Sequence, residues 1–230
     1  MRVRILPLLP AAALALVILA PAAMRADEVI FSNFGQNQSY QGSSWFDTGN
    51  SSSGNEVNAF AFSPTATATV TGAALPLTLV AGTAATPLTV YIESNSSLNT
   101  PGTILATLTS TGSYSHYPAT PDVVDFTCSG SCGTLDAGST YWIVDQATDP
   151  TNTTGWLWSY DTDGTWYYNG LGSATGPWTA ATNFANDIGA FDVTGTPSTV
   201  PPVPEPSSLA LLGSGLFGIL AAARRKVCKK

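Results

Sequence analysis

The stretch AFAFSPTATATVTGAAL, residues 59–75, decides the fold class of this 230-residue chain. Apolar and polar residues alternate in it, and Phe60 and Phe62 fall on one face of an extended chain. The stretch PLTVYIES, residues 87–94, alternates in the same way and places Leu88, Val90 and Ile92 together. Because a period of two residues is typical of a strand that buries one face, both stretches are predicted to be β-strands.

Similar short segments rich in Thr, Val and aromatic residues follow, separated by Gly, Pro, Asn and Ser, and none sustains a helical period. They are residues 104–109, 123–127, 140–145, 155–160, 165–169 and 187–194. Roughly eight to ten strands suit a single β-sandwich whose core is large enough for independent stability. We therefore expect an all-β domain over residues 27–196, a two-sheet antiparallel β-sandwich of jelly-roll type.

Charge is distributed very unevenly along the chain. All 8 Lys and Arg residues lie at the two ends, so no Lys or Arg occurs between Arg25 and Arg224. The same interval holds all 15 acidic residues, whereas the formal charge of the whole chain is only −7. Nucleic-acid binding requires cationic side chains that neutralise phosphates, so this class of function is excluded for the body.

Residues 1–26 have the layout of a secretory signal peptide: an Arg-bearing start, an apolar run and small residues near a cut after Ala23 or Ala26. This predicts export through the secretion translocon, and an uncleaved N-terminal membrane helix is the alternative. Export would also bring the motif CSGSC into an oxidising environment, where disulfides form. Cys128 and Cys132 are predicted to close a small disulfide loop, since zinc would need more ligands than two cysteines and one histidine.

The other end of the chain has three parts. Residues 197–206 are a proline-rich linker, residues 207–223 carry no charge, and residues 224–230 are basic. As a helix, the uncharged segment would span about 25 Å, so we expect a single C-terminal transmembrane helix there. Arg224, Arg225 and Lys226 then mark a basic cytoplasmic tail, because positive residues flank membrane segments on that side. An ordinary membrane anchor that happens to follow prolines is one interpretation of this end of the chain.

A more specific interpretation comes from Val203-Pro204-Glu205-Pro206, followed by the apolar segment and the Arg-rich end. This arrangement resembles the PEP-CTERM sorting signal of Gram-negative bacteria. The resemblance implies that Pro204, Glu205 and Pro206 are recognised by an exosortase, a membrane cysteine protease, as lipid-anchor signals are recognised and removed. It further implies a protein held briefly at the inner membrane and then located at the cell surface or outside the cell.

Short segments spread over the body carry a second resemblance. They are Phe34-Gly35 with Ser39-Tyr40 and Trp45, then residues 61–64, 101–105, 135–142 and 190–193. Together they resemble the choice-of-anchor R domain, a family found on exported bacterial proteins with interchangeable sorting tails. The family provides no catalytic residues to transfer to this chain, and CSGSC is not part of its pattern.

Catalytic motifs are scarce. His116 is the only histidine, its neighbours indicate an exposed loop, and no G-x-S-x-G motif occurs. A glycoside hydrolase would need two carboxylates at a defined separation, which 15 acidic residues can match by chance. We therefore predict no catalytic residue, and a glycan hydrolase stays as the enzymatic alternative.

The segment GWLWSYDTDGTWYYNG, residues 155–170, is predicted to be a hairpin that turns at Asp163-Gly164. Trp156 and Trp158 lie on one face of its first strand, and Trp166 begins the return strand. Aromatic rings in a row can stack on sugars, but their alternation toward one face favours packing in the core of a Trp-rich domain.

Calcium is the one metal that the sequence suggests. Asp161 and Asp163, with Asp149 or Asn169, carry the hard oxygen ligands that calcium prefers, but a calcium-loop motif is not matched. Capping of turns explains these residues better, so we expect no metal site and no cofactor, and calcium stays as the alternative.

These observations together predict a non-enzymatic exported protein of the cell surface or extracellular matrix, processed by exosortase. A carbohydrate-binding, lectin-like module for extracellular polysaccharide is the alternative.

Overall fold

The computed structural model describes residues 26–52, 54–82, 88–149, 151–161, 164–181 and 187–198. These residues form thirteen strands and no helix, and all ladders between the strands are antiparallel. The strands are β1 (Glu28–Ser32), β2 (Gln41–Ser51), β3 (Gly54–Phe62), β4 (Ala68–Ala81), β5 (Leu88–Asn95), β6 (Pro101–Thr109), β7 (Asp122–Cys128), β8 (Thr134–Leu135), β9 (Tyr141–Ala147), β10 (Thr153–Trp158), β11 (Trp166–Asn169), β12 (Thr179–Ala180) and β13 (Asp192–Pro197). The predicted all-β class is thereby confirmed.

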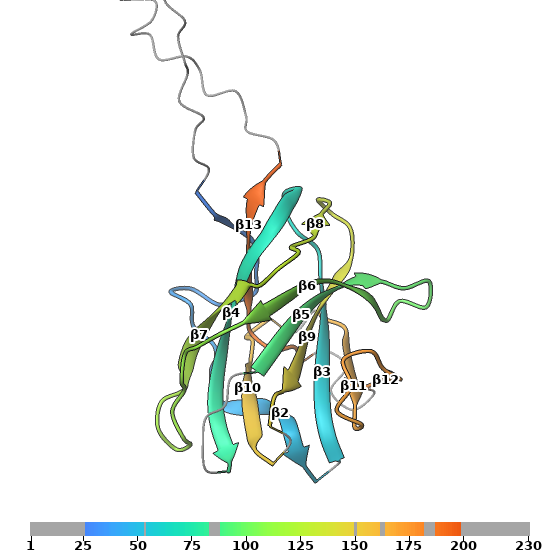
Figure 1. The fold of residues 1–230 in the computed structure, drawn as a ribbon. Helices are drawn as coiled ribbons and strands as arrows, with labels where there is room; N and C mark the ends of the chain where they lie inside the picture. Colours follow the sequence, from blue (N-terminus) through green and yellow to red (C-terminus); the bar gives the residue numbers. More distant parts are fainter. Residues whose placement is uncertain are drawn as a thin grey trace, which may run out of the picture.

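Eight of these strands close into a barrel, in the order β4-β10-β2-β3-β9-β5-β6-β7, with β7 pairing back to β4 (Figure 1). The predicted two-sheet, jelly-roll-like sandwich is therefore wrong. The physical reason is that alternation tells which side chains point inward, and inward-facing residues look the same in a sandwich and in a barrel. Closure of the barrel depends on which strands pair with β4. The alternation of apolar and polar residues does not reveal these pairing partners.

β4 is the longest strand, with 14 residues, and it has different neighbours along its length. Its first half pairs with β13 and β8, its middle with β7 and its last residues with β10. Gly72 permits this crowding, because a Cβ atom there would lie 2.5 Å from the Phe126 carbonyl oxygen and 3.1 Å from the Thr194 hydroxyl. Its lack of a side chain lets β7 and β13 approach β4 from both sides.

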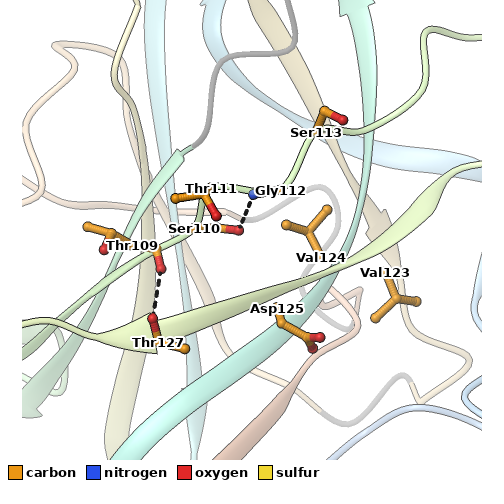
Figure 2. Close-up of a pocket in the computed structure, with 9 residues that line it drawn as sticks. All are labelled: Thr109, Ser110, Thr111, Gly112, Ser113, Val123, Val124, Asp125 and Thr127. Carbon is orange, nitrogen blue, oxygen red and sulfur yellow. Dashed lines mark hydrogen bonds between the residues drawn. The ribbon is translucent and has the colours of Figure 1, made fainter.

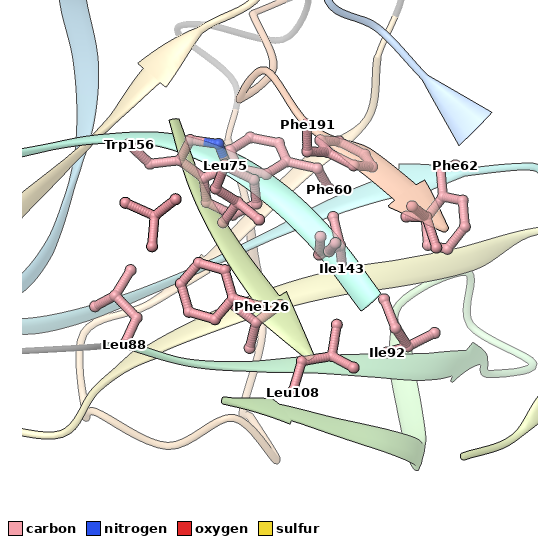
Figure 3. Close-up of a cluster of buried hydrophobic side chains, with 14 of the residues drawn as sticks. Phe60, Phe62, Leu75, Leu88, Ile92, Leu108, Phe126, Ile143, Trp156 and Phe191 are labelled. Carbon is pink, nitrogen blue, oxygen red and sulfur yellow. The ribbon is translucent and has the colours of Figure 1, made fainter. Parts of the chain in front are cut away.

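The interior of the barrel is filled by large apolar side chains from most of the strands (Figure 3). Phe60 lies at its centre and contacts the rings of Phe46 and Trp156, at centroid distances of 4.9 and 4.7 Å. The residues predicted to share inward faces do so: Phe60 with Phe62, and Leu88 with Val90 and Ile92, belong to this one core. These buried side chains stabilise the ring as one unit.

A second apolar cluster lies outside the barrel wall. Val57, Ala59, Trp142, Val144 and Ala174 are buried there, packed against side chains of the β11–β12 segment. β9 is consequently buried on both faces over its first five residues. The β11–β12 pair thus covers one side of the barrel rather than taking part in its ring.

The two ends of the described body lie side by side. β1 pairs with β13, so that Glu28 is opposite Gly195, and the Thr196 hydroxyl donates to the Asp27 carboxylate at 2.9 Å. The chain therefore enters and leaves the body at the same end (Figure 1).

No helix among the described residues is long and apolar enough to cross a membrane. Residues 207–223, where we predicted a transmembrane helix, lie outside these residues, as do residues 1–25 of the predicted signal peptide, the sorting motif Pro204-Glu205-Pro206 and the basic tail.

Replacing Phe60 by alanine should lower the free energy of unfolding by about 3–5 kcal/mol, because a fully buried ring leaves a cavity among other rings. Urea denaturation of the purified protein measures this change. Val29→Ala, at a side chain that is 51% exposed, is the control and should change stability by less than about 0.5 kcal/mol. A similar effect of both substitutions would contradict the assigned core.

Candidate functional site

A polar network lies inside the barrel where β2 and β3 diverge, since their ladder is only three residue pairs long. The Asp145 carboxylate accepts hydrogen bonds from the Asn58 backbone N–H at 2.7 Å and from the Thr48 hydroxyl. The Asn58 side chain donates to the Asp47 carbonyl oxygen at 2.9 Å and accepts the Trp166 indole N–H at 3.2 Å. The network thus joins β2, β3, β9 and β11 across this seam.

The second buried acid, Glu93, lies on the opposite face of the wall. It is directly paired with Trp142, which belongs to the outer cluster, whereas Asp145 is paired with the inward-facing Val90. Neither carboxylate oxygen of Glu93 has a hydrogen-bond partner among the described residues. Tyr91 shares its face, and the pKa of Tyr91 is raised by burial and, secondarily, by the Glu93 charge.

Burial controls the protonation of both acids. It raises the pKa of Glu93 to about 8 and that of Asp145 to about 7, although the bonds from Thr48 and Asn58 act against the shift at Asp145. The body supplies no Lys or Arg that could form an ion pair with either acid. Both carboxyls therefore tend to hold a proton well above the pH at which an exposed carboxyl loses it.

A pocket of about 410 Å³ opens where β6 and β7 separate (Figure 2). The two strands pair only at Leu108–Cys128 and Thr109–Thr127, and the chain then leaves the sheet as a loop. The lining consists of Thr109, Ser110, Thr111, Gly112, Ser113, Val123, Val124, Asp125 and Thr127. Sequence reasoning missed this site, because its Ser- and Thr-rich loop resembles every other loop in this chain.

The lining of this pocket is hydroxyl-rich, with one carboxylate. Ser110 Oγ accepts the Gly112 N–H at 3.0 Å, and the Thr127 hydroxyl donates to the Thr109 carbonyl oxygen at 3.5 Å. Asp125 is exposed and is the only charged residue of the lining. Such a surface can hold a small polar molecule, but its described residues do not pair a nucleophile with a base.

His116 lies outside this pocket, on the exposed loop that follows it. Its Nδ1 atom is 2.6 Å from the Tyr117 carbonyl oxygen. The structure thus places the single histidine in a loop, as the sequence predicted.

The three tryptophans considered as a sugar-stacking row are in different environments. Trp156 is fully buried, and its indole N–H donates to the Ala190 carbonyl oxygen at 2.8 Å. Trp158 and Trp166 are partly buried and pack against Phe46, at centroid distances of 5.3 and 4.4 Å. All three rings therefore belong to or border the core.

The hairpin predicted for residues 155–170 does not form. β10 pairs with β2 and β4, whereas β11 pairs with β3 and β12. Local turn chemistry favours a hairpin at Asp163-Gly164, but each strand finds a partner that is distant in sequence. Residues 162–163 lie outside the described residues.

Cys128, the last residue of β7, and Cys132 in the loop that follows it are a pair capable of forming the predicted disulfide, with Cα atoms 6.1 Å apart.

Two of the oxygen ligands considered for calcium are engaged in local turns. The Asp149 carboxylate accepts the backbone N–H and the hydroxyl of Thr151, at 2.9 and 2.7 Å, and Asn169 Oδ1 accepts the Leu171 N–H at 2.6 Å. Within the described ranges, no group of three or more His, Cys, Asp or Glu side chains is arranged to hold a metal ion.

A further aromatic pair, Trp45 and Tyr117, lies on the outside of the barrel with ring centroids 5.1 Å apart. Sequence reasoning did not single out either residue as a functional one. They are 72 positions apart in the chain, and only the fold brings them together.

Comparison with protein families identifies a sorting signal near the C-terminus of the chain. Residues 202–226 match the PEP-CTERM protein-sorting motif. The motif indicates an exported protein of Gram-negative bacteria that is sorted by exosortase and associates transiently with the membrane before processing. A search of the curated proteins found no match, and the resemblance to the choice-of-anchor R domain is not supported by these comparisons.

The stability of the body should decrease as pH rises from about 4.5 to 8. Over this range the unfolded chain releases the Glu93 proton, whereas the folded state keeps it, so the folded state binds more protons and loses stability as pH increases. Asp145 acts in the same direction up to about pH 7. Glu93→Gln should remove on the order of 2–4 kcal/mol of this decrease, as measured by urea denaturation at pH 5 and pH 8.

Asp125→Asn, at an exposed carboxyl, is the matched control and should leave the pH dependence unchanged. A wild-type protein that is equally stable at both pH values would rule out a protonated Glu93 in the folded state.

Proposed function

We propose that this chain is a non-enzymatic exported protein of the cell surface or extracellular matrix. The barrel is its functional domain, and the C-terminal segment is its sorting signal. The observation that carries the proposal is the match of residues 202–226 to the PEP-CTERM sorting motif, directly after a folded body that ends at β13.

The structure of the body supports a scaffold rather than an enzyme. Apolar side chains fill the barrel interior, so it contains core and not a substrate cavity. The two acids with strongly raised pKa, Glu93 and Asp145, lie on opposite faces of the wall. They cannot flank one glycosidic bond, as the two carboxyls of a glycoside hydrolase do.

The position of the sorting motif limits where exosortase acts. Seven residue steps separate Pro197, the last residue of β13, from Pro204, and a chain of this length spans at most about 25 Å. The protease therefore meets the end of the body that carries β1 and β13. The opposite end of the barrel stays free for contacts during processing.

Cleavage should require both exosortase and the tripeptide. In a Gram-negative host that has exosortase, we expect mass spectrometry to find a mature protein that lacks the basic C-terminus, and the same host without exosortase should retain it. Glu205→Ala should block cleavage, whereas Pro201→Ala, just before the matched residues, should not. Identical C-terminal masses in both hosts would refute the proposal.

Binding of extracellular polysaccharide is a second proposed function. The row of Trp156, Trp158 and Trp166 offers little for it, because a sugar cannot reach the buried ring of Trp156 and the other two rings pack on Phe46. The outer aromatic pair, Trp45 and Tyr117, favours this function from a different surface.

A further inference from the structure

Trp45 and Tyr117 form an aromatic corner on the outer surface of the barrel. Trp45 belongs to β2 and is partly exposed, whereas Tyr117 belongs to the loop between β6 and β7 and is 47% exposed. Their ring planes meet at 54° with centroids 5.1 Å apart. The two rings are thus in contact with each other, and the exposed part of the Tyr117 ring faces solvent beside the partly exposed indole.

Gly155 on β10 allows the Trp45 ring to lie against the strand. A Cβ atom at Gly155 would be 2.8 Å from Trp45 Cγ and 3.0 Å from a methyl group of Val80. Any side chain at this position would push the indole outward. The indole N–H also donates to Asp47 Oδ1 at 3.0 Å, which fixes the direction of the ring.

The loop that carries Tyr117 is fastened to the barrel. The Tyr117 backbone N–H donates to the Leu79 carbonyl oxygen at 2.9 Å, and the Leu79 N–H donates to the Ser115 carbonyl oxygen at 2.9 Å. Further along the loop, the Tyr40 hydroxyl donates to the Pro121 carbonyl oxygen at 2.8 Å. The Trp45 indole and the backbone that carries Tyr117 are therefore held in place, so little of this surface has to be ordered when a ligand binds.

We propose that Trp45 and Tyr117 bind a pyranose ring of a neutral extracellular polysaccharide. The apolar C–H face of a sugar stacks on aromatic rings, and polar groups around the corner can bond to its hydroxyls. These groups are the Asp47 carboxylate, which accepts the Trp45 indole N–H, and the Tyr117 hydroxyl. A surface with carboxylates and without Lys or Arg repels acidic polysaccharides, so the ligand is a neutral one.

The corner is remote from the sorting segment. Along β4, Ala68 pairs with Pro197 at the exit of the chain, whereas Thr78 pairs with Gly155 beneath the Trp45 ring. Ten residue steps of a strand cover roughly 30 Å. A polysaccharide can therefore be bound while the C-terminal end of the same molecule is still at the membrane.

The inference deepens the second proposed function, polysaccharide binding, and rests on the sorting proposal only in requiring export to a place where polysaccharide is present. Its test is affinity electrophoresis of the purified mature protein in gels that contain laminarin, hydroxyethyl cellulose or dextran, with alginate as the acidic comparison. We expect retardation by at least one neutral glucan, and a loss of affinity of about tenfold or more in Tyr117→Ala and Trp45→Ala.

The control is Tyr160→Ala, at a tyrosine that is 60% exposed and does not belong to the corner. It should bind as the wild type does. Tyr117→Ala removes a half-exposed ring and no backbone hydrogen bond, so it decides the result even where Trp45→Ala destabilises the fold. Unchanged retardation of Tyr117→Ala, no retardation of the wild type by any neutral glucan, or retardation by alginate alone would overturn the proposal. Exosortase cleavage of these variants should stay normal, which separates this inference from the sorting proposal.

Discussion

The pairing of β4 with β7 on one side and β10 on the other is the constraint on which the rest of the structure depends. Without the β4–β7 ladder, the eight strands would be an open sheet with two exposed edges. Closure pairs the backbone groups of both edges, which would otherwise be open to pairing with the strands of other molecules. It also encloses the apolar side chains of the inner face in one core. Gly72 contributes to this closure, because its lack of a side chain lets β7 approach β4 closely.

The lack of cationic side chains imposes a second constraint, on the electrostatics of the body. Acids at the surface can stay ionised in water, but a buried acid in this chain has only hydrogen bonds or a proton to compensate its charge. Asp145 uses hydrogen bonds from Thr48 and Asn58, and Glu93 on the opposite face has only the proton. The body is therefore better suited to acidic or neutral surroundings than to alkaline ones, which is a property of its composition as much as of its fold.

The sequence predicts strands well and their partners poorly. The alternation around Phe60 and along Leu88, Val90 and Ile92 identified inward faces, because burial on one side is a local property of a strand. β2 was missed, since its Gly, Ser, Thr and Asn residues carry no alternating pattern and its buried Phe46 stands nearly alone. Barrel closure was missed for a different reason: it depends on contacts between residues far apart in the chain. The same limit explains the aromatic row, where the pattern of residues 155–170 was visible but its burial depended on the strands around it.

β4 connects the two functional regions that we propose. Its first residues lie beside the exit of the sorting segment, and its last residues lie beneath the aromatic corner. Because a strand held by ladders on both sides resists bending, it acts as a spacer of nearly fixed length between the membrane-directed end and the Trp45–Tyr117 surface. In this arrangement, exosortase cleaves the chain near the end of the molecule where β1 and β13 pair. In our proposal the ligand binds at the other end, where the rings lie ten residue steps of β4 away from the exit of the tail.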